Sequence, residues 1–357
     1  MSFPPAADWT PDPALRAVLS GLLDFDVATL HPVGGGRNSR VLRAADRNGT
    51  PYIVKIYFRH DGDTRDRLTT EFQALTFLRE HGVCNVPRPL AMSADHGCLL
   101  LECVEGRTID RTSVGRIDVE AAADFLVRLK ALSVCPAAGR LGEASEACFS
   151  IGAILGNLRQ RLDRFTSFEP HSSADESLRE FLQHDLLPGL DTLEGWCRRR
   201  AVASDVAFDD DVDQLARTLS PSDFGFHNAL RRPAGDLVFL DFEYFGWDDP
   251  AKMAADVILH PAMELEPTLK RVFIRRLLTS FGEGTGLARR LEVVYPLFGL
   301  KWCVILLNEF LPAVWRRRRF AGRASSEVEA AKLEQLVKAR RMWATIEGQY
   351  ESFPYFD

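Results

Sequence analysis

The pattern of hydrophobic and polar positions changes near residue 105. Before it, short apolar or alternating runs predict strands, and Asn48-Gly49 between the first two is a strong β-hairpin signal. A helix is predicted from about residue 64 to His81, ended by Gly82. The predicted strands are 39–44, 52–58, 88–92 and 98–102.

After Gly106 the pattern is mostly helical, with one exception. Two short apolar runs, 229–232 and 237–240, are joined by Pro233-Ala234-Gly235-Asp236, which predicts a second hairpin. Helical periodicity then continues to the end, with breaks near 282–286 and 321–325. A sheet-rich domain, 1–105, followed by a helical domain, 106–357, with one inserted hairpin predicts an α+β fold.

The second hairpin is flanked by residues suited to phosphate chemistry. Asp223 and Asn228 lie in a loop just before its first strand, and Asp241 follows its second strand, so we expect Asp241 to return to the neighbourhood of Asn228. Amide and carboxylate oxygens are ligands for Mg²⁺, and the remaining carboxylate, Asp223, can accept a proton from a hydroxyl. The alternative interpretation is a surface turn with ordinary caps.

A lysine and a glutamate stand where charges need partners. Lys55 lies inside an apolar predicted strand, and Glu71 shares one face of the following helix with Leu68, Leu75 and Leu78. We therefore expect Lys55 and Glu71 to pair. The alternative is that Glu71 lies at the edge of the apolar stripe and Lys55 extends to water.

A glycine-rich segment, Gly34-Gly35-Gly36-Arg37-Asn38-Ser39, precedes Lys55. Glycines let backbone N–H groups approach phosphates closely. The spacing matches neither a P-loop nor a dinucleotide-binding fingerprint, so by itself it predicts only a loop.

Composition and charge narrow the possible functions. The chain has 357 residues, 46% hydrophobic and 26% charged, which excludes a disordered or low-complexity protein. A net charge of −6 offers no general attraction to nucleic acid or anionic membranes. The 7 cysteines are scattered, without metal-ligand spacing, which is typical of a reducing compartment.

No secretory leader or membrane span is expected. The N-terminus lacks a basic and apolar leader pattern. The longest apolar stretch, Val293–Leu307, is interrupted by Pro296 and Lys301 and is shorter than the roughly 20 residues that cross a bilayer. We therefore expect a cytoplasmic protein.

Taken in order, these motifs resemble those of the protein-kinase-like small-molecule phosphotransferases, which include aminoglycoside phosphotransferases and choline kinases. Asp241-Phe242-Glu243, followed by Gly246-Trp247-Asp248-Asp249-Pro250 and Asp256, resembles this branch rather than the protein kinases. The similarity covers about residues 25–260. It implies a bilobal fold with a small β-rich N-lobe and a large helical C-lobe, and ATP and Mg²⁺ as cofactors.

The resemblance also implies a role for each matching residue. Asp223 would be the catalytic base, and Asn228 and Asp241 the Mg²⁺ ligands. Asp249 and Asp256 would brace the catalytic loop by hydrogen bonds. The implied nucleotide-binding residues are Gly35, Gly36, Asn38 and Ser39 in the glycine-rich loop, Lys55 with Glu71 holding it, and Glu102 and Val104 in the hinge.

One position departs from the family pattern. Two residues before the catalytic aspartate the family usually has histidine, and here the residue is Pro221. A non-catalytic protein that binds a nucleotide or metabolite is therefore one alternative. A protein kinase is another, although the segment between Asp241 and Asp256 is short for an activation segment.

No motif in the sequence identifies the molecule that accepts the phosphoryl group. We favour a hydroxylated small molecule, a sugar or aminosugar, and expect neither nucleic acid nor membrane as a partner. Several polar positions stay open: Arg316–Arg319 as an anion site or an exposed helix end, and Lys301, Trp302, Asn308 and Glu309 as pocket lining or helix edge. His227 is expected to pack within its loop.

Overall fold

The structure is a computed structural model. It describes residues 13–23, 26–33, 39–58, 65–165, 170–282, 286–315 and 328–356. Contacts group the chain into two compact units, which are described separately. The first unit comprises residues 1–107, 230–244 and 312–327, and the second comprises 108–229, 245–311 and 328–357. The domain boundary expected after residue 105 stays a prediction.

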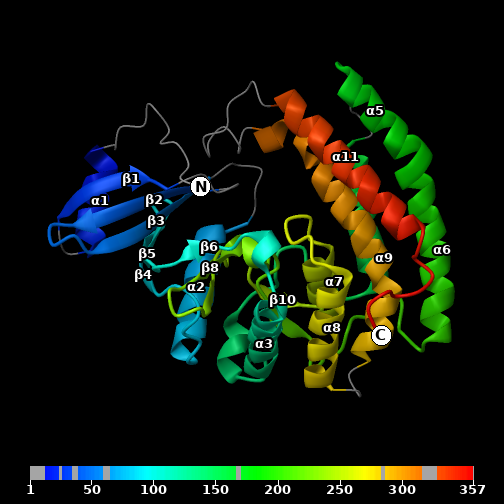
Figure 1. Cartoon of the computed structure of the whole chain (residues 1–357), viewed down its shortest axis with the longest axis horizontal. Helices are drawn as coiled ribbons and strands as arrows, with labels where there is room; N and C mark the ends of the chain where they lie inside the picture. The colour runs from blue at the N-terminus through cyan, green and yellow to red at the C-terminus, as the bar shows by residue number, and fades with distance from the viewer. Residues whose placement is uncertain are drawn as a thin grey trace. The chain divides into compact units, whose positions relative to one another are not determined.

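The first unit contains an antiparallel five-stranded sheet in the order β1-β2-β3-β5-β4 (Figure 1). Its central hairpin confirms the one predicted around Asn48-Gly49, with Gly49 at a φ of +84°. In the register, Lys55 lies opposite Val41 on one side and Leu99 on the other. The strands are β1 (Val27–Pro32), β2 (Ser39–Asp46), β3 (Pro51–Tyr57), β4 (Pro89–Ser93) and β5 (Cys98–Glu102).

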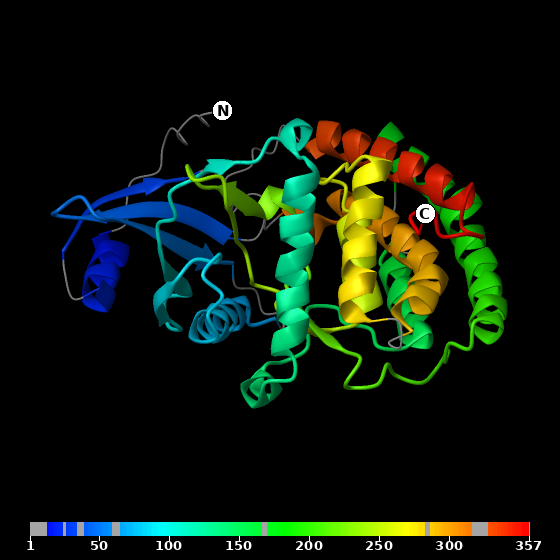
Figure 2. The same cartoon turned by 60° about the horizontal axis from the view of Figure 1, so that its bottom comes forward.

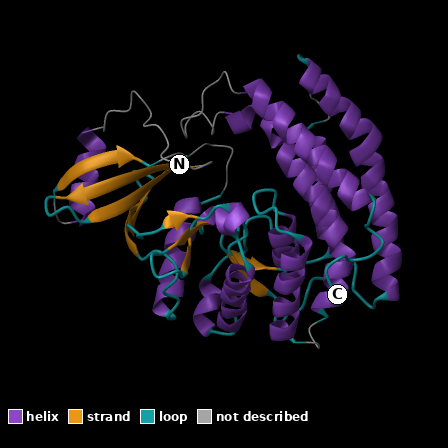
Figure 3. Cartoon of the chain, viewed as in Figure 1, coloured by secondary structure: helices purple, strands orange, loops and turns teal. Residues whose placement is uncertain are grey.

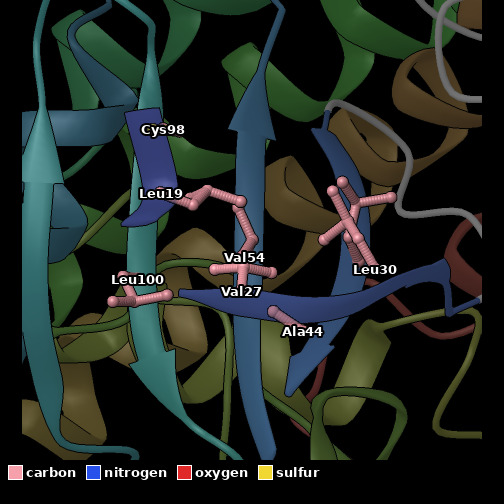
Figure 4. Close-up of a cluster of buried hydrophobic side chains, with 8 residues drawn as sticks. Leu19, Val27, Leu30, Ala44, Val54, Cys98 and Leu100 are labelled. Atoms are coloured by element: carbon pink, nitrogen blue, oxygen red, sulfur yellow. The ribbon is translucent and has the colours of Figure 1, made fainter. Parts of the chain in front are cut away.

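Two helices belong to this sheet. Helix α1 (Pro13–Leu23) contributes Leu19 to a buried cluster with Val54 and Leu100, shown in Figure 4. Helix α2 (Arg67–Glu80) is capped by Asp66, whose side chain accepts a hydrogen bond from the Thr69 N–H. The predicted apolar face of α2 is buried, and the helix begins at Arg67 rather than near residue 64.

Three short strands form a further sheet in the order β6-β8-β9. They are β6 (Arg107–Thr108), β8 (Ala229–Arg231) and β9 (Leu237–Phe239). The last two are the predicted second hairpin. Within the first unit, the Phe239 N–H donates to the carbonyl of Asn85, which ties the end of the hairpin to the segment after α2.

The second unit is mainly helical, as Figures 2 and 3 show. Helix α9 packs against α6, α7 and α11, and α3 packs against α8. Strands β7 and β10 pair in a two-stranded sheet, and β7 leads the chain into the loop that holds Asp223. The elements are α3 (Arg116–Leu132), α4 (Ile151–Asp163), α5 (Ser173–Phe181), α6 (Leu187–Ala203), β7 (Thr218–Ser220), β10 (Gly246–Asp248), α7 (Pro250–Leu259), α8 (Pro267–Phe281), α9 (Leu287–Leu306) and α11 (Val328–Glu347).

The apolar stretch near residue 300 differs from the prediction. Pro296 and Lys301 were expected to leave it too short to cross a bilayer, but α9 includes both residues, and the helical segment Leu287–Phe310 is long and apolar enough to cross a membrane. However, 83% of its most apolar window is buried inside the structure, because α6, α7 and α11 pack around it. Its hydrophobicity is therefore that of a core helix. The segment Arg316–Arg319 lies outside the described residues.

Candidate active site

The first unit brings two predicted site residues, Glu71 and Asp241, to the Lys55 ammonium. Its Nζ lies 2.5 Å from Oε2 of Glu71 and 2.7 Å from Oδ1 of Asp241, although Asp241 is 186 residues further along the chain. Lys55 is buried. Burial would lower its pKa, but the charges of Asp241 and Glu71 outweigh this effect and raise the pKa well above 10.5, so Lys55 remains a cation.

Glu71 has a second partner that the sequence analysis missed. The Tyr57 hydroxyl donates to the same Oε2 atom that contacts Lys55. Burial raises the pKa of Glu71, and the Lys55 charge opposes this change. Tyr57 stands two residues after Lys55 on β3, so both side chains lie on one face of the strand, and that spacing was the available signal.

Asp241 occupies a constrained backbone position. Its φ is +67°, in the left-handed region that residues other than glycine adopt infrequently. Glu71, Asp241 and Glu243 bring one carboxylate oxygen each within 4.8 Å of one another, a grouping that could hold a cation. Lys55 contacts two of these carboxylates, and Arg67 lies 3.7 Å from Glu243. These two basic side chains therefore neutralise part of the acidic cluster.

The other expected nucleotide-binding residues fall in three places. Ser39 begins β2 and is buried, whereas Gly35, Gly36 and Asn38 lie outside the described residues. Glu102 ends β5, where its N–H donates to the carbonyl of Arg88. Val104 follows β5 and is half-buried.

The second unit contains Asp223, which two histidines hold. His227 Nε2 lies 3.0 Å and His260 Nε2 lies 3.1 Å from the same oxygen, Oδ1. Burial would raise the pKa of Asp223, but the two imidazole hydrogen bonds outweigh it and hold the pKa well below 3.8. The carboxylate is therefore ionised at neutral pH. The side chain is 37% exposed, so a ligand can reach it.

The tautomer of His260 follows from its surroundings. The Ala262 N–H points at Nδ1 from 3.0 Å, so Nδ1 accepts and the ring proton lies on Nε2, where it is donated to Asp223. Asp223, His227 and His260 have the proximity of a metal site. A metal ion bound to Nε2 would displace this proton and move it to Nδ1, where it would conflict with the Ala262 N–H. The three side chains therefore form a hydrogen-bonded cluster rather than a metal site.

His227 was expected only to pack within its loop, but it contacts both His260 and Asp223. Its ring stacks on that of His260, with centroids 4.1 Å apart and planes 16° apart. Gly225 makes room for this arrangement, because a Cβ there would lie 2.8 Å from Nδ1 of His227. No sequence spacing connects His260 to this loop, since it lies 37 residues after Asp223.

A buried ion cluster lies behind the catalytic loop. Lys252 contacts Asp248 at 2.6 Å and Asp256 at 3.1 Å, and its Nζ lies 3.5 Å from the Ser222 hydroxyl. Burial raises the pKa of Asp248 to about 6, against the opposing charge of Lys252. Burial alone would lower the pKa of Lys252, but the charges of Asp248 and Asp256 raise it.

Asp249 and Asp256 were expected to brace the catalytic loop, and of the two only Asp256 is connected to it, through Lys252. Asp249 caps α7 by accepting from the Ala251 N–H at 2.8 Å, and its other oxygen pairs with Arg290 at 2.7 Å. Asp256 instead binds Lys252 and accepts from the indole N–H of Trp302. The side chain that reaches the loop is therefore Lys252, because it lies on the face of α7 toward residue 222.

Asn228 lies at the end of the Asp223 loop. Its amide nitrogen donates to the backbone carbonyl of Asp223 at 3.1 Å. This bond uses the side-chain NH2 group of Asn228. The side-chain carbonyl oxygen is the atom that can bind a metal ion.

A cavity of about 430 Å³ lies beside the histidine pair in the second unit. His260 forms part of its wall, so the cavity reaches the residue that binds Asp223. Lys301, Trp302, Asn308 and Glu309 do not line this described cavity. Its polar lining residues are His260, Glu264, Glu266, Lys270, Tyr295, Lys338, Arg341, Thr345 and Tyr355.

Solved structures place the fold among the protein-kinase-like phosphotransferases. A choline kinase, LicA, from Streptococcus pneumoniae is 16% identical with a TM-score of 0.57, covering 93% of this chain and 98% of that one. The spectinomycin phosphotransferase APH(9)-Ia is 12% identical with a TM-score of 0.62, covering 95% and 99%. The aminoglycoside phosphotransferase APH(2")-IIa, in its gentamicin complex, is 15% identical with a TM-score of 0.59, covering 97% and 100%.

The sequence itself defines the family. The model of the phosphotransferase enzyme family matches residues 29–293, which is more than half of the chain. No sequence among the curated proteins matches. The chain belongs to the phosphotransferase enzyme family and is a small-molecule phosphotransferase. The resemblance and the α+β fold predicted from the sequence are thus confirmed.

Proposed function

We propose that the chain transfers the γ-phosphoryl group of ATP, with Mg²⁺, to a hydroxyl of a small molecule. The observation that carries this proposal is the buried Lys55 ammonium held between Glu71 and Asp241. A fixed cation of this kind suits the α- and β-phosphates of a nucleotide. Glu71 fixes it, and backbone groups at Glu102 and Val104 are the proposed adenine contacts.

The chemistry of each predicted metal ligand also suits Mg²⁺. Asp241 has a carboxylate with a side chain that is 36% exposed, and Asn228 has an amide oxygen whose nitrogen is already bonded. Such hard oxygen atoms are the ligands that Mg²⁺ prefers. When bound, the ion would neutralise charge on the phosphate oxygens.

Asp223 is the proposed catalytic base. Its low pKa makes it a weak base that orients the acceptor hydroxyl and takes the proton late. That behaviour suits phosphoryl transfer, in which the transition state is loose and positioning contributes most of the catalysis.

The cavity beside His260 is the proposed acceptor pocket. Tyr295, Thr345 and Tyr355 are among its lining residues, together with two glutamates and several basic residues. A lining with many hydrogen-bonding groups favours a polyhydroxylated acceptor such as a sugar or aminosugar.

A mass-resolved phosphorylation screen tests this function. Purified protein and Mg-ATP are incubated with pooled sugars, aminosugars, amino alcohols, nucleosides and aminoglycosides. Asp223→Asn is the test variant, and Asp191→Asn, an exposed carboxylate on α6, is the matched control. We expect a singly phosphorylated product with wild type and Asp191→Asn only.

Two other outcomes have defined meanings. Full turnover by Asp223→Asn would overturn the role of that residue. Nucleotide binding with no product in any pool would favour the alternative of a non-catalytic binding protein, in line with Pro221 at the position of the family histidine.

A further inference from the structure

We propose that His260, together with His227, is a positioning residue for Asp223, and this inference rests on the proposed role of Asp223 as base. Both imidazoles bond the same carboxylate oxygen, Oδ1, at 3.1 and 3.0 Å. Among the described residues, no side chain donates to the other oxygen, Oδ2. The pair therefore fixes the rotation of the carboxylate and leaves Oδ2 for the acceptor hydroxyl.

The position of His260 is fixed from three directions. The Ala262 N–H donates to its Nδ1 at 3.0 Å. One face stacks on His227, and the Trp302 ring meets His260 edge-on, with centroids 4.5 Å apart and planes at 69°. His260 is buried, so these contacts restrict the ring and, through it, the carboxylate.

Residues farther from Asp223 hold His260 and the loop in place. The Trp302 indole N–H donates to Oδ1 of Asp256 at 3.0 Å, and Asp256 pairs with Lys252. The same Lys252 reaches the hydroxyl of Ser222, which precedes Asp223. The loop and the histidine that holds its carboxylate are thus tied to one buried ion cluster, and both ties keep the carboxylate at a constant place relative to α7.

His260 has a second role, because it also lines the cavity that is proposed to bind the acceptor. A residue that both holds the base and forms the pocket wall couples acceptor position to base position. His227 does not line that cavity, so the two histidines can be separated by experiment.

The test compares two replacements of His260. His260→Gln keeps an N–H donor near the place of Nε2, whereas His260→Leu keeps bulk and loses the donor. His184→Gln, an exposed histidine in the segment between α5 and α6, is the matched control. The probe is Mg-ATP turnover with water as phosphoryl acceptor, measured as kcat and as KM for ATP, and thermal unfolding monitors the fold.

We expect His260→Leu to lower kcat about 10- to 100-fold, the loss typical of a hydrogen bond to a charged group, with KM for ATP unchanged within about twofold. His260→Gln should recover most of the loss, and His184→Gln should match wild type. A purely structural role would lower thermal stability in both His260 variants without this difference in kcat.

The outcomes separate this inference from the proposed function. If Asp223→Asn turns over like wild type, the role of Asp223 fails. If Asp223→Asn is inactive while His260→Leu keeps wild-type kcat, only the positioning role fails. If His260→Leu does not fold, the partly exposed His227 provides the same comparison: His227→Leu should lower kcat, His227→Gln should restore it, and equal kcat values would overturn the inference.

Discussion

Lys301 is a buried lysine whose ion-pair contact, to Glu146, is long, and its replacement should stabilise the protein. Its side chain lies in α9, its residue is 4% exposed, and its Nζ lies 3.6 Å from Glu146, a carboxylate already bonded to Arg161. Burial, reinforced by the like charge of Lys252, lowers the pKa of Lys301 from 10.5 to about 8. The folded state therefore disfavours the charged form.

The size and sign of the effect follow from this pKa. The difference between 10.5 and about 8 corresponds to about 3 kcal/mol against folding while the lysine is charged in both states. This cost is fully present below about pH 8. Between about pH 8 and 10.5 the folded protein releases the proton while the unfolded chain keeps it, so stability rises with pH.

Urea unfolding of Lys301→Met measures the prediction. We expect the variant to be more stable than wild type by up to about 3 kcal/mol at neutral pH, with the difference shrinking toward about pH 10. Lys338→Met is the control, because the Lys338 side chain is 42% exposed and paired with Glu334, and the change should alter stability by less than about 0.5 kcal/mol. A less stable Lys301→Met at neutral pH, or a difference independent of pH, would refute the reasoning.

Three further substitutions have defined expectations in urea unfolding. Lys252→Met should destabilise by about 3–5 kcal/mol, because it leaves the carboxylate of Asp248 buried without its cation; a stabilising result would contradict the described ion cluster. Gly246→Ala should lower the free energy of unfolding by about 1–3 kcal/mol, because the added Cβ would lie 2.4 Å from the backbone nitrogen of Ala144. An unchanged urea midpoint would count against that close packing. Tyr57→Phe should cost about 1–3 kcal/mol by removing a buried hydrogen bond to a carboxylate, and wild-type stability would show that bond to be dispensable.

Local patterns predicted four strands of the main sheet and helix α2, but not helix α1 or strand β1. Asn48-Gly49 located the central hairpin, and the spacing of Leu68, Leu75 and Leu78 located the buried face of α2. These features depend on turn geometry and side-chain periodicity, which act over a few residues. The pairing of Lys55 with Glu71 followed from the same pattern, because a buried carboxylate on that face requires a cation.

Long-range packing decided what local patterns could not. The apolar stretch Val293–Leu307 was expected to be too short to cross a bilayer, yet it belongs to the longer helical segment Leu287–Phe310, whose most apolar window is 83% buried under neighbouring helices. Asp249 was expected at the loop and instead caps α7 and binds Arg290. Such outcomes depend on which helix faces meet, and no short segment contains that information.

The sequence by itself indicated four strands of the main sheet, helix α2, the second hairpin, the family, and the polar residues available for phosphate chemistry. Only the tertiary structure placed His260 against Asp223, 37 residues away, and Asp241 against Lys55, 186 residues away. The physical reason is that a hydrogen bond or ion pair depends on distance in space. Periodicity shows which face a side chain occupies, and tertiary packing alone decides which partner that face meets.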